Sequence, residues 1–220
     1  MISGRAAWRY DMADITYPSF RQFVPSAYDF GPVRVVRGSG ISPLSVNEQF
    51  IELPYSHRWT QIITLRAATH EERSDIEGEV ERWINPANRL LIWHLARPAP
   101  RGTMRGSPTL NGAHSQGATS LSIANAGVNA TILRGDMIGV TTTATYAVQL
   151  VRVVADATAN GSGVATLTVE PALRASANTG SAIVWDKPKA LWRPVSPAFS
   201  ARYLPGKAES LTIEFREVLA

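Results

Sequence analysis

The sequence contains no cysteine among its 220 residues. Disulfide bonds and thiolate metal sites are therefore excluded, and the fold must be held by packing or by assembly with partners. The four histidines are scattered along the chain, and no two of them have the spacing of metal ligands. Phosphate-cradling glycine loops and dinucleotide fingerprints are also missing. The sequence therefore predicts neither a metal nor a cofactor.

Long hydrophobic runs are missing as well. No stretch approaches the roughly 18 apolar residues that a membrane span requires. The first residues, MISGRAAWRYDMADITYP, carry acids where a secretory signal would have its apolar core. We expect a soluble chain with no export signal and no membrane partner. Its hydrophobic content of 45% is typical of a folded protein with one large or two small domains.

Lysine is scarce, because only three of the 22 basic residues are lysines and the others are arginines. The net charge of +4 raises the question of nucleic-acid binding. The charges are interspersed, however, and no segment forms the concentrated basic block of a DNA-binding protein. We therefore expect no direct sequence-specific binding of nucleic acid. Genome composition and the use of arginine in interfaces explain the preference for arginine over lysine better than nucleic-acid binding does.

Catalytic motifs are absent too. The two Gly-Ser-Gly tripeptides do not precede a helix, as a nucleophile elbow would, and His70-Glu71-Glu72 lacks the second histidine of a zinc protease. Arg134-Gly135-Asp136 spells the adhesion tripeptide, but its position before a strand favours a turn. The sequence predicts a structural or binding protein and not an enzyme.

The first 46 residues are rich in proline and aromatic residues and show no helical period. Prolines disfavour long regular ladders, so only Val33–Arg37 is predicted as a strand. We expect residues 1–32, called the N-terminal arm below, to lie extended across their own or a neighbour's surface. A loop-rich edge of one domain is the alternative. The aromatic residues expected to contact a partner are Trp8, Tyr10, Phe20, Phe23 and Tyr28.

Regular elements follow the arm. Residues Gln49–Pro54, Trp59–Ala67 and Arg89–Leu95 have the composition of strands. The spacing predicts one helix over residues 69–84, with Thr69 as the N-cap and Glu72 completing a capping box. Ile76, Val80, Trp83 and Ile84 would form its apolar stripe.

Residues 103–189 differ in composition from the residues before them, with small residues and few charges. Strands are predicted at Thr119–Ile123 and Ile132–Val140. A hairpin is predicted from Tyr146–Ala155 and Gly163–Glu170, with its reversal at Asn160-Gly161. Larger apolar and charged residues return after residue 190, with strands at Ala198–Tyr203 and Glu209–Val218.

This change of composition predicts a mainly β protein built from two parts. A β-sandwich domain with one α-helix would comprise residues 1–102 and 190–220. A small β-barrel or sandwich domain, residues 103–189, would be inserted into it, with its two ends close together. One continuous β-sandwich with long hairpins is the alternative.

The order of the segments GDMIGV, VVADATANGSGVATLTVEPALR and AIVWDKPKALWRP resembles the tail-tip proteins of long-tailed bacteriophages, namely the distal tail proteins and their minor tail relatives. The resemblance covers residues 120–195 in sequence and the rest of the chain by layout. It implies a β-sandwich that forms a closed homo-oligomeric ring, typically a hexamer, between the tail tube protein and the tail hub protein. The inserted domain would point outward and contact receptor-binding or other peripheral tail proteins.

The resemblance places the protein in the tail tip of the virion, after assembly in the bacterial host cytoplasm. The alternative is a carbohydrate-binding or receptor-binding adhesin module of a phage tail, in which residues 103–189 contact host glycans. An exposed pair of aromatic residues in that segment would favour the alternative.

Overall fold

The computed structural model describes residues 13–33, 36–38, 50–52, 57–66, 69–85, 88–144, 148–196, 198–199, 203–205 and 207–218. Within these ranges the protein is mainly β, with one α-helix and one short 3-10 helix. The elements up to the middle of the chain are β1 (Ala13–Thr16), η1 (Arg21–Phe23), β2 (Pro25–Val33), β3 (Val36–Gly38), β4 (Phe50–Glu52), β5 (Arg58–Leu65), α1 (His70–Ile84), β6 (Asn88–Ile92), β7 (Thr109–Leu110) and β8 (Ser120–Ala124). The later elements are β9 (Thr131–Ile132), β10 (Met137–Thr141), β11 (Val148–Val153), β12 (Ala157–Thr158), β13 (Ala165–Glu170), β14 (Ile183–Val184), β15 (Ala190–Pro194), β16 (Tyr203–Leu204), β17 (Lys207–Ala208) and β18 (Leu211–Glu217).

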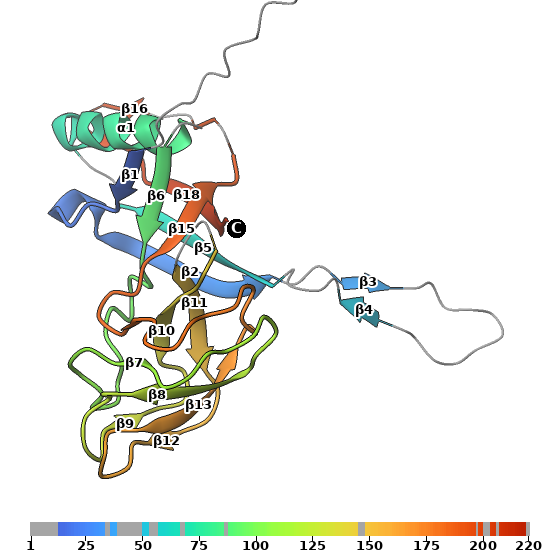
Figure 1. Ribbon diagram of the computed structural model, residues 1–220. Coiled ribbons are helices and arrows are strands. Elements are labelled where there is room, and N and C mark those ends of the chain that lie inside the picture. Colours follow the sequence, from blue (N-terminus) through green and yellow to red (C-terminus); the bar gives the residue numbers. More distant parts are fainter. Residues whose placement is uncertain are drawn as a thin grey trace, which may run out of the picture.

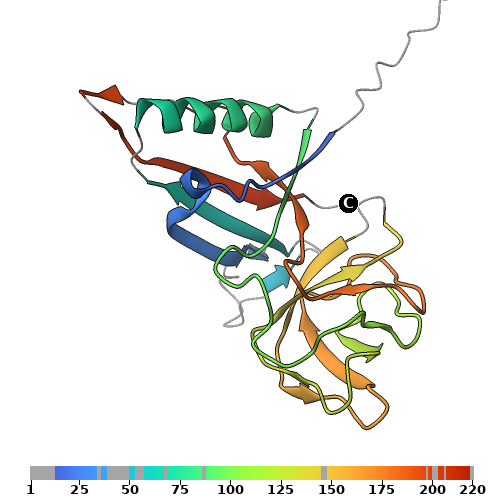
Figure 2. The same ribbon diagram turned by 90° about the vertical axis from the view of Figure 1, so that its left-hand side faces the viewer.

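Two six-stranded sheets form the body of the protein. The first sheet has the order β1-β6-β15-β18-β5-β2, and the second has the order β14-β10-β11-β13-β8-β7. In Figure 1 and Figure 2, α1 and the second sheet lie at opposite ends of the molecule, with the first sheet between them. All strands of the second sheet come from the chain between β6 and β15, which are neighbours in the first sheet.

The C-terminal strand β18 lies inside the first sheet, between β15 and β5. On β18 the side chains of Leu211, Ile213 and Phe215 are buried, and they alternate with exposed polar residues. The strand predicted at residues 209–218 is therefore confirmed over Leu211–Glu217. Because β18 pairs on both sides, the N-terminal part of the chain completes this sheet only with the C-terminal strand.

The helix α1 follows its local sequence signals closely. The Thr69 hydroxyl accepts a hydrogen bond from the Glu72 backbone N–H (3.2 Å), and the Glu72 carboxylate accepts one from the Thr69 N–H (3.3 Å). This is the predicted capping box. Ile76, Val80 and Trp83 are buried against the first sheet, so the predicted apolar stripe is confirmed for these three residues.

The prediction for the N-terminal arm was wrong in one respect. Residues Pro25–Val33 form the nine-residue strand β2, which pairs with β5 along its length. Two prolines are tolerated because β2 is an edge strand, where missing N–H groups need not interrupt a ladder. The strand predicted at Val33–Arg37 falls partly on residues outside the described ranges.

Two turns differ in detail from the predictions. Arg134-Gly135 is a turn, as predicted, but it divides the strand predicted at residues 132–140 into β9 and β10. In the hairpin of β11 and β13, the reversal at Asn160 is present, because the Asn160 carbonyl oxygen accepts from the Gly163 N–H (2.9 Å). The positive φ of +73° belongs to Gly163 and not to Asn160 or Gly161.

The second sheet has its own core, formed by buried residues between Met104 and Ile183. Its edge strands β7 and β14 approach each other through an isolated bridge between Thr109 and Ala182. Ladder pairing does not close the sheet into a barrel. The two ends of the intervening segment lie side by side, because the Lys187 N–H donates to the Pro98 carbonyl oxygen (2.6 Å).

We predict that Gly78→Ala stabilises the protein by about 0.5–1 kcal/mol, because alanine lowers the conformational entropy of the unfolded chain. Gly78 is exposed in the middle of α1, and a Cβ atom there would meet no atom within 4 Å. Gly102→Ala is the matched control and should destabilise, since its Cβ would overlap the Thr131 carbonyl oxygen. Urea unfolding of both variants tests this, and a destabilising Gly78→Ala would contradict it.

Candidate functional site

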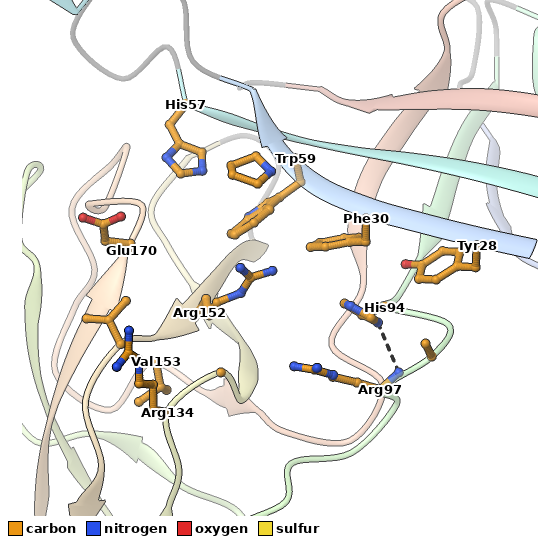
Figure 3. Close-up of a pocket in the computed structure, with 14 residues that line it drawn as sticks. Tyr28, Phe30, His57, Trp59, His94, Arg97, Arg134, Arg152, Val153 and Glu170 are labelled. Carbon is orange, nitrogen blue, oxygen red and sulfur yellow. Dashed lines mark hydrogen bonds between the residues drawn. The ribbon is translucent and has the colours of Figure 1, made fainter.

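A cleft of about 710 Å³ opens where the two sheets meet. One wall comes from β2, β5 and the segment after β6, and the other comes from β10, β11 and β13 or the turns beside them. Figure 3 shows the lining side chains converging from both walls. The lining residues are Tyr28, Phe30, Pro32, His57, Trp59, His94, Ala96, Arg97, Arg134, Gly135, Arg152, Val153, Val154 and Glu170.

Aromatic rings form the wall that belongs to the first sheet. Phe30 stacks on Trp59, with ring centroids 5.0 Å apart, and His94 lies 4.4 Å from Phe30. The Tyr28 hydroxyl donates to Gln61 Oε1 (3.1 Å) and accepts from the Leu95 N–H (3.3 Å). Burial raises the pKa of Tyr28 above its ordinary value. This wall is therefore packed and held by hydrogen bonds.

Arg152 crosses the cleft from β11 of the second sheet. Its guanidinium lies 4.8 Å from the Trp59 ring centroid and 5.9 Å from that of Phe30, which is a cation–π arrangement. Its Nε is buried and has no hydrogen-bond partner in the described part of the chain. Burial, and secondly the charge of Arg97, lowers the pKa of Arg152. Arg152 is thus a cation whose surroundings do not neutralise it.

Two further arginines face the cleft from exposed positions. Arg97 follows β6, and Arg134 lies in the turn before β10. Neither guanidinium forms an ion pair with any carboxylate in the described part of the chain. Among the described lining residues, Glu170 at the rim supplies the one carboxylate. The cleft therefore has an excess of positive charge.

The positive charge of the cleft affects the pKa of His94. It is 8% exposed, and its Nδ1 accepts a hydrogen bond from the Arg97 N–H (3.1 Å), so that nitrogen carries no proton. Burial, followed by the charges of Arg97 and Arg152, lowers the pKa of His94 from 6.5 to about 4. At neutral pH the imidazole is uncharged and the arginines carry the positive charge.

This arrangement suits a ligand with oxyanion groups. Arginine presents N–H donors in a planar fork that matches carboxylate and phosphate oxygens. The ring of Trp59 is only 2% exposed, and Arg152 and His94 pack against the Trp59 and Phe30 rings. Those rings therefore offer no open face for a sugar or a nucleobase to stack on.

The position of the cleft is fixed by contacts between the sheets. The Trp59 indole N–H donates to the Leu150 carbonyl oxygen of β11 (3.0 Å). Glu217 of β18 accepts from the Trp59 backbone N–H (3.1 Å) and pairs with Arg174. Burial raises the pKa of Glu217, and the Arg174 charge opposes that rise. Met137 and Leu150 of the second sheet join the core of the first.

Asp136 fixes the turn that carries Arg134. The carboxylate accepts from three backbone N–H groups, those of Arg101 (2.9 Å), Gly102 (3.2 Å) and Leu133 (2.9 Å). Asp136 is 3% exposed, so the Arg-Gly-Asp tripeptide has the structural role of a turn, as predicted. Gly135 adopts φ +92°, which favours glycine at this position.

The aromatic residues predicted to contact a partner lie in different environments. Phe23 is 2% exposed and packs in the protein's own core beside Tyr17 and Trp83. Tyr28 belongs to the cleft wall. Phe20 is 67% exposed, and its role as a contact residue stays a prediction. Trp8 and Tyr10 lie outside the described residues.

Little in the sequence indicates the cleft. Arg97, Arg134 and Arg152 belong to three separate segments, and no local pattern connects them. The preference for arginine over lysine is the one available signal, and it indicates interface use without a location. Within the described ranges, no three histidine, aspartate or glutamate side chains are grouped so that they could hold a metal ion.

The chain matches no model of a known protein family, and it has no significant match among curated proteins. In the described part of the protein, α1 is too short and too polar to cross a membrane.

We predict that the buried His94 makes the folded protein sensitive to acid. The unfolded chain binds a proton at His94 near pH 6.5, whereas the folded protein binds it only near pH 4. This contribution to stability is therefore complete above pH 6.5 and is lost as the pH falls toward 4, by about 3 kcal/mol in total.

The measurement is urea unfolding between pH 7 and pH 4.5. The wild-type protein should lose about 2–3 kcal/mol more than His94→Asn, whose side chain does not titrate in this range. An NMR titration in which His94 shows an ordinary pKa near 6.5 would contradict the prediction.

Proposed function

We propose that the protein is a structural component of the tail tip of a long-tailed bacteriophage. It would be a ring-forming protein of the distal tail type that joins the end of the tail tube to the central hub. The observation that carries this proposal is the resemblance of residues 120–195 to that family, in the sequence and the order of their segments. Its place would be the virion tail tip, after assembly in the host cytoplasm.

The mainly β architecture is compatible with the layout that this family implies. Residues 1–102 and 190–220 would form the ring domain, which contains the first sheet and α1. Residues 103–189 would form the inserted, outward domain, because they supply the second sheet and its separate core. The neighbouring positions of Pro98 and Lys187 agree with an insertion.

The arginine-lined cleft supports a binding role for the protein. Arg152 is held against aromatic rings, and Arg97 and Arg134 are exposed. None of the three forms an ion pair with a described carboxylate, so they are ready to pair with the acidic groups of another molecule. In the proposed setting, such molecules are other copies of this chain, the tail tube and hub proteins, or a receptor-binding protein.

The adhesin alternative is less well supported. Residues 103–189 contain only two aromatic residues, Tyr146 and Trp185. The Trp185 indole N–H donates to the Gly106 carbonyl oxygen (2.8 Å), and the Arg105 guanidinium lies 5.0 Å from its ring centroid. One tryptophan engaged in this way is a weak platform for stacking a sugar ring.

We expect the purified chain to form a closed cyclic oligomer, alone or on its tail tube, because the proposed family forms rings and a repeated heterologous interface gives a ring when its rotation closes. Light scattering and native mass spectrometry measure the number of subunits. Phe20→Ser should weaken this assembly without unfolding the protein, since Phe20 is exposed. The control is Val128→Ser, because Val128 is exposed to the same extent but lies within residues 103–189. A strictly monomeric protein in solution and in particles would refute the ring.

We also expect residues 103–189 to fold alone, because their core is built from their own residues. Circular dichroism of the isolated fragment should show a cooperative thermal transition. A fragment without such a transition would contradict this expectation and would show that the second sheet needs the core of the first sheet to fold. The contacts of Met137 and Leu150 with that core would be the reason.

A further inference from the structure

We propose that the arginine-lined cleft is a carboxylate-binding site that takes the acidic side chains of a protein segment. The three arginines Arg97, Arg134 and Arg152 define it. The site does not depend on the bacteriophage assignment, because the geometry of the cleft alone supports it.

Arg152 holds an unsatisfied charge in a fixed position. It packs against Trp59 and Phe30, which orients its guanidinium before any ligand arrives. Its Nε is a buried donor without an acceptor, and a buried unpaired donor is costly. An oxyanion at this place would supply the acceptor and neutralise part of the charge, so the free cleft is organised for such a ligand.

The shape of the cleft favours a ligand with several carboxylates. The cleft is open, and Arg97 and Arg134 lie at exposed positions beside the half-buried Arg152. A single small ion would leave most of its 710 Å³ unfilled. Because Arg97, Arg134 and Arg152 all line this cleft, a segment with two or three carboxylates could reach them together.

The walls of the cleft favour an acidic protein segment over a nucleic acid. A nucleic-acid strand needs a basic groove along its backbone and open aromatic faces for its bases. Here Arg152 and His94 pack against the rings of Trp59 and Phe30, and Glu170 lies at the rim. Discrete carboxylates fit this arrangement better.

The chain itself contains a segment of the required chemistry. The helix α1 carries six acidic residues and two arginines, and a third arginine, Arg66 before the helix, pairs with Glu72. Glu71, Asp75 and Glu81 are exposed, and Gly78 among them leaves the helix backbone open to close approach. Because α1 and the second sheet lie at opposite ends of the molecule, α1 would meet the cleft of a second copy and not its own. A different protein is the other source of such a segment.

The site is tested with the full-length protein and a decaglutamate peptide. Binding is followed by isothermal calorimetry and by the NMR signals of His94, whose pKa should rise when carboxylates lie near it. Arg97→Glu/Arg134→Glu should weaken binding by at least about tenfold. Arg21→Glu/Arg193→Glu changes the net charge equally at exposed positions outside the cleft, and it should bind nearly as well as the wild type.

Three results would overturn the proposal. They are no binding of decaglutamate at low salt, equal weakening by the control variant, and tighter binding of the oligonucleotide (dT)10 that also shifts the His94 signals. The last result would assign the cleft to nucleic acid.

Measuring the self-association of charge-reversal variants identifies which molecule supplies the carboxylates. If α1 of a second copy supplies them, which is the expected result, Glu71→Lys/Glu81→Lys loses self-association, and mixing it with Arg97→Glu/Arg134→Glu restores it. If Glu71→Lys/Glu81→Lys associates as the wild type does, the carboxylates belong to another protein.

Discussion

Trp59 is the residue on which the relation between the two sheets depends. Its ring is buried where they meet, its indole N–H is bonded to Leu150 of the second sheet, and its backbone N–H is bonded to Glu217 of the first. Glu217 in turn pairs with Arg174 from the second half of the chain. Separating the sheets would remove the acceptor of the Trp59 indole N–H and the arginine partner of the Glu217 carboxylate, and the loss of either partner costs free energy. The contact is therefore specific as well as apolar.

The cleft follows from the same contact. Successive side chains of a strand point to opposite faces, so Leu150 and Arg152 of β11 share one face while Val151 and Val153 share the other. Val151 and Val153 belong to the core of the second sheet, whereas Leu150 belongs to the core of the first. Once Leu150 meets Trp59, Arg152 is brought over the Trp59 ring. The packing that joins the sheets thus also places the central cation.

The charges of the molecule are distributed unevenly. Acidic residues gather on α1, at one end of the molecule, and arginines without an ion pair among the described residues gather in the cleft where the two sheets meet. A molecule with separate acidic and basic surfaces favours contacts between the unlike surfaces of two copies over contacts between like surfaces, because like charges repel. Repetition of such a contact gives a ring when the rotation closes. This distribution is compatible with the proposed place in a tail tip, where subunits surround an axis.

The elements whose signals are local follow from the amino-acid sequence alone. The capping box of Thr69 and Glu72 sets the start of α1, the alternation along residues 211–217 predicts a half-buried strand, and Arg134-Gly135 forms a turn. Features that depend on position in the sheet or on distant segments arise only from packing. Proline can remain in β2 only because that strand is at an edge, and Phe23 of η1 is buried because it packs against Tyr17 and against Trp83 of α1. The three arginines of the cleft, at positions 97, 134 and 152, meet only when the two sheets pack, because no local pattern records a contact between segments so far apart in the chain.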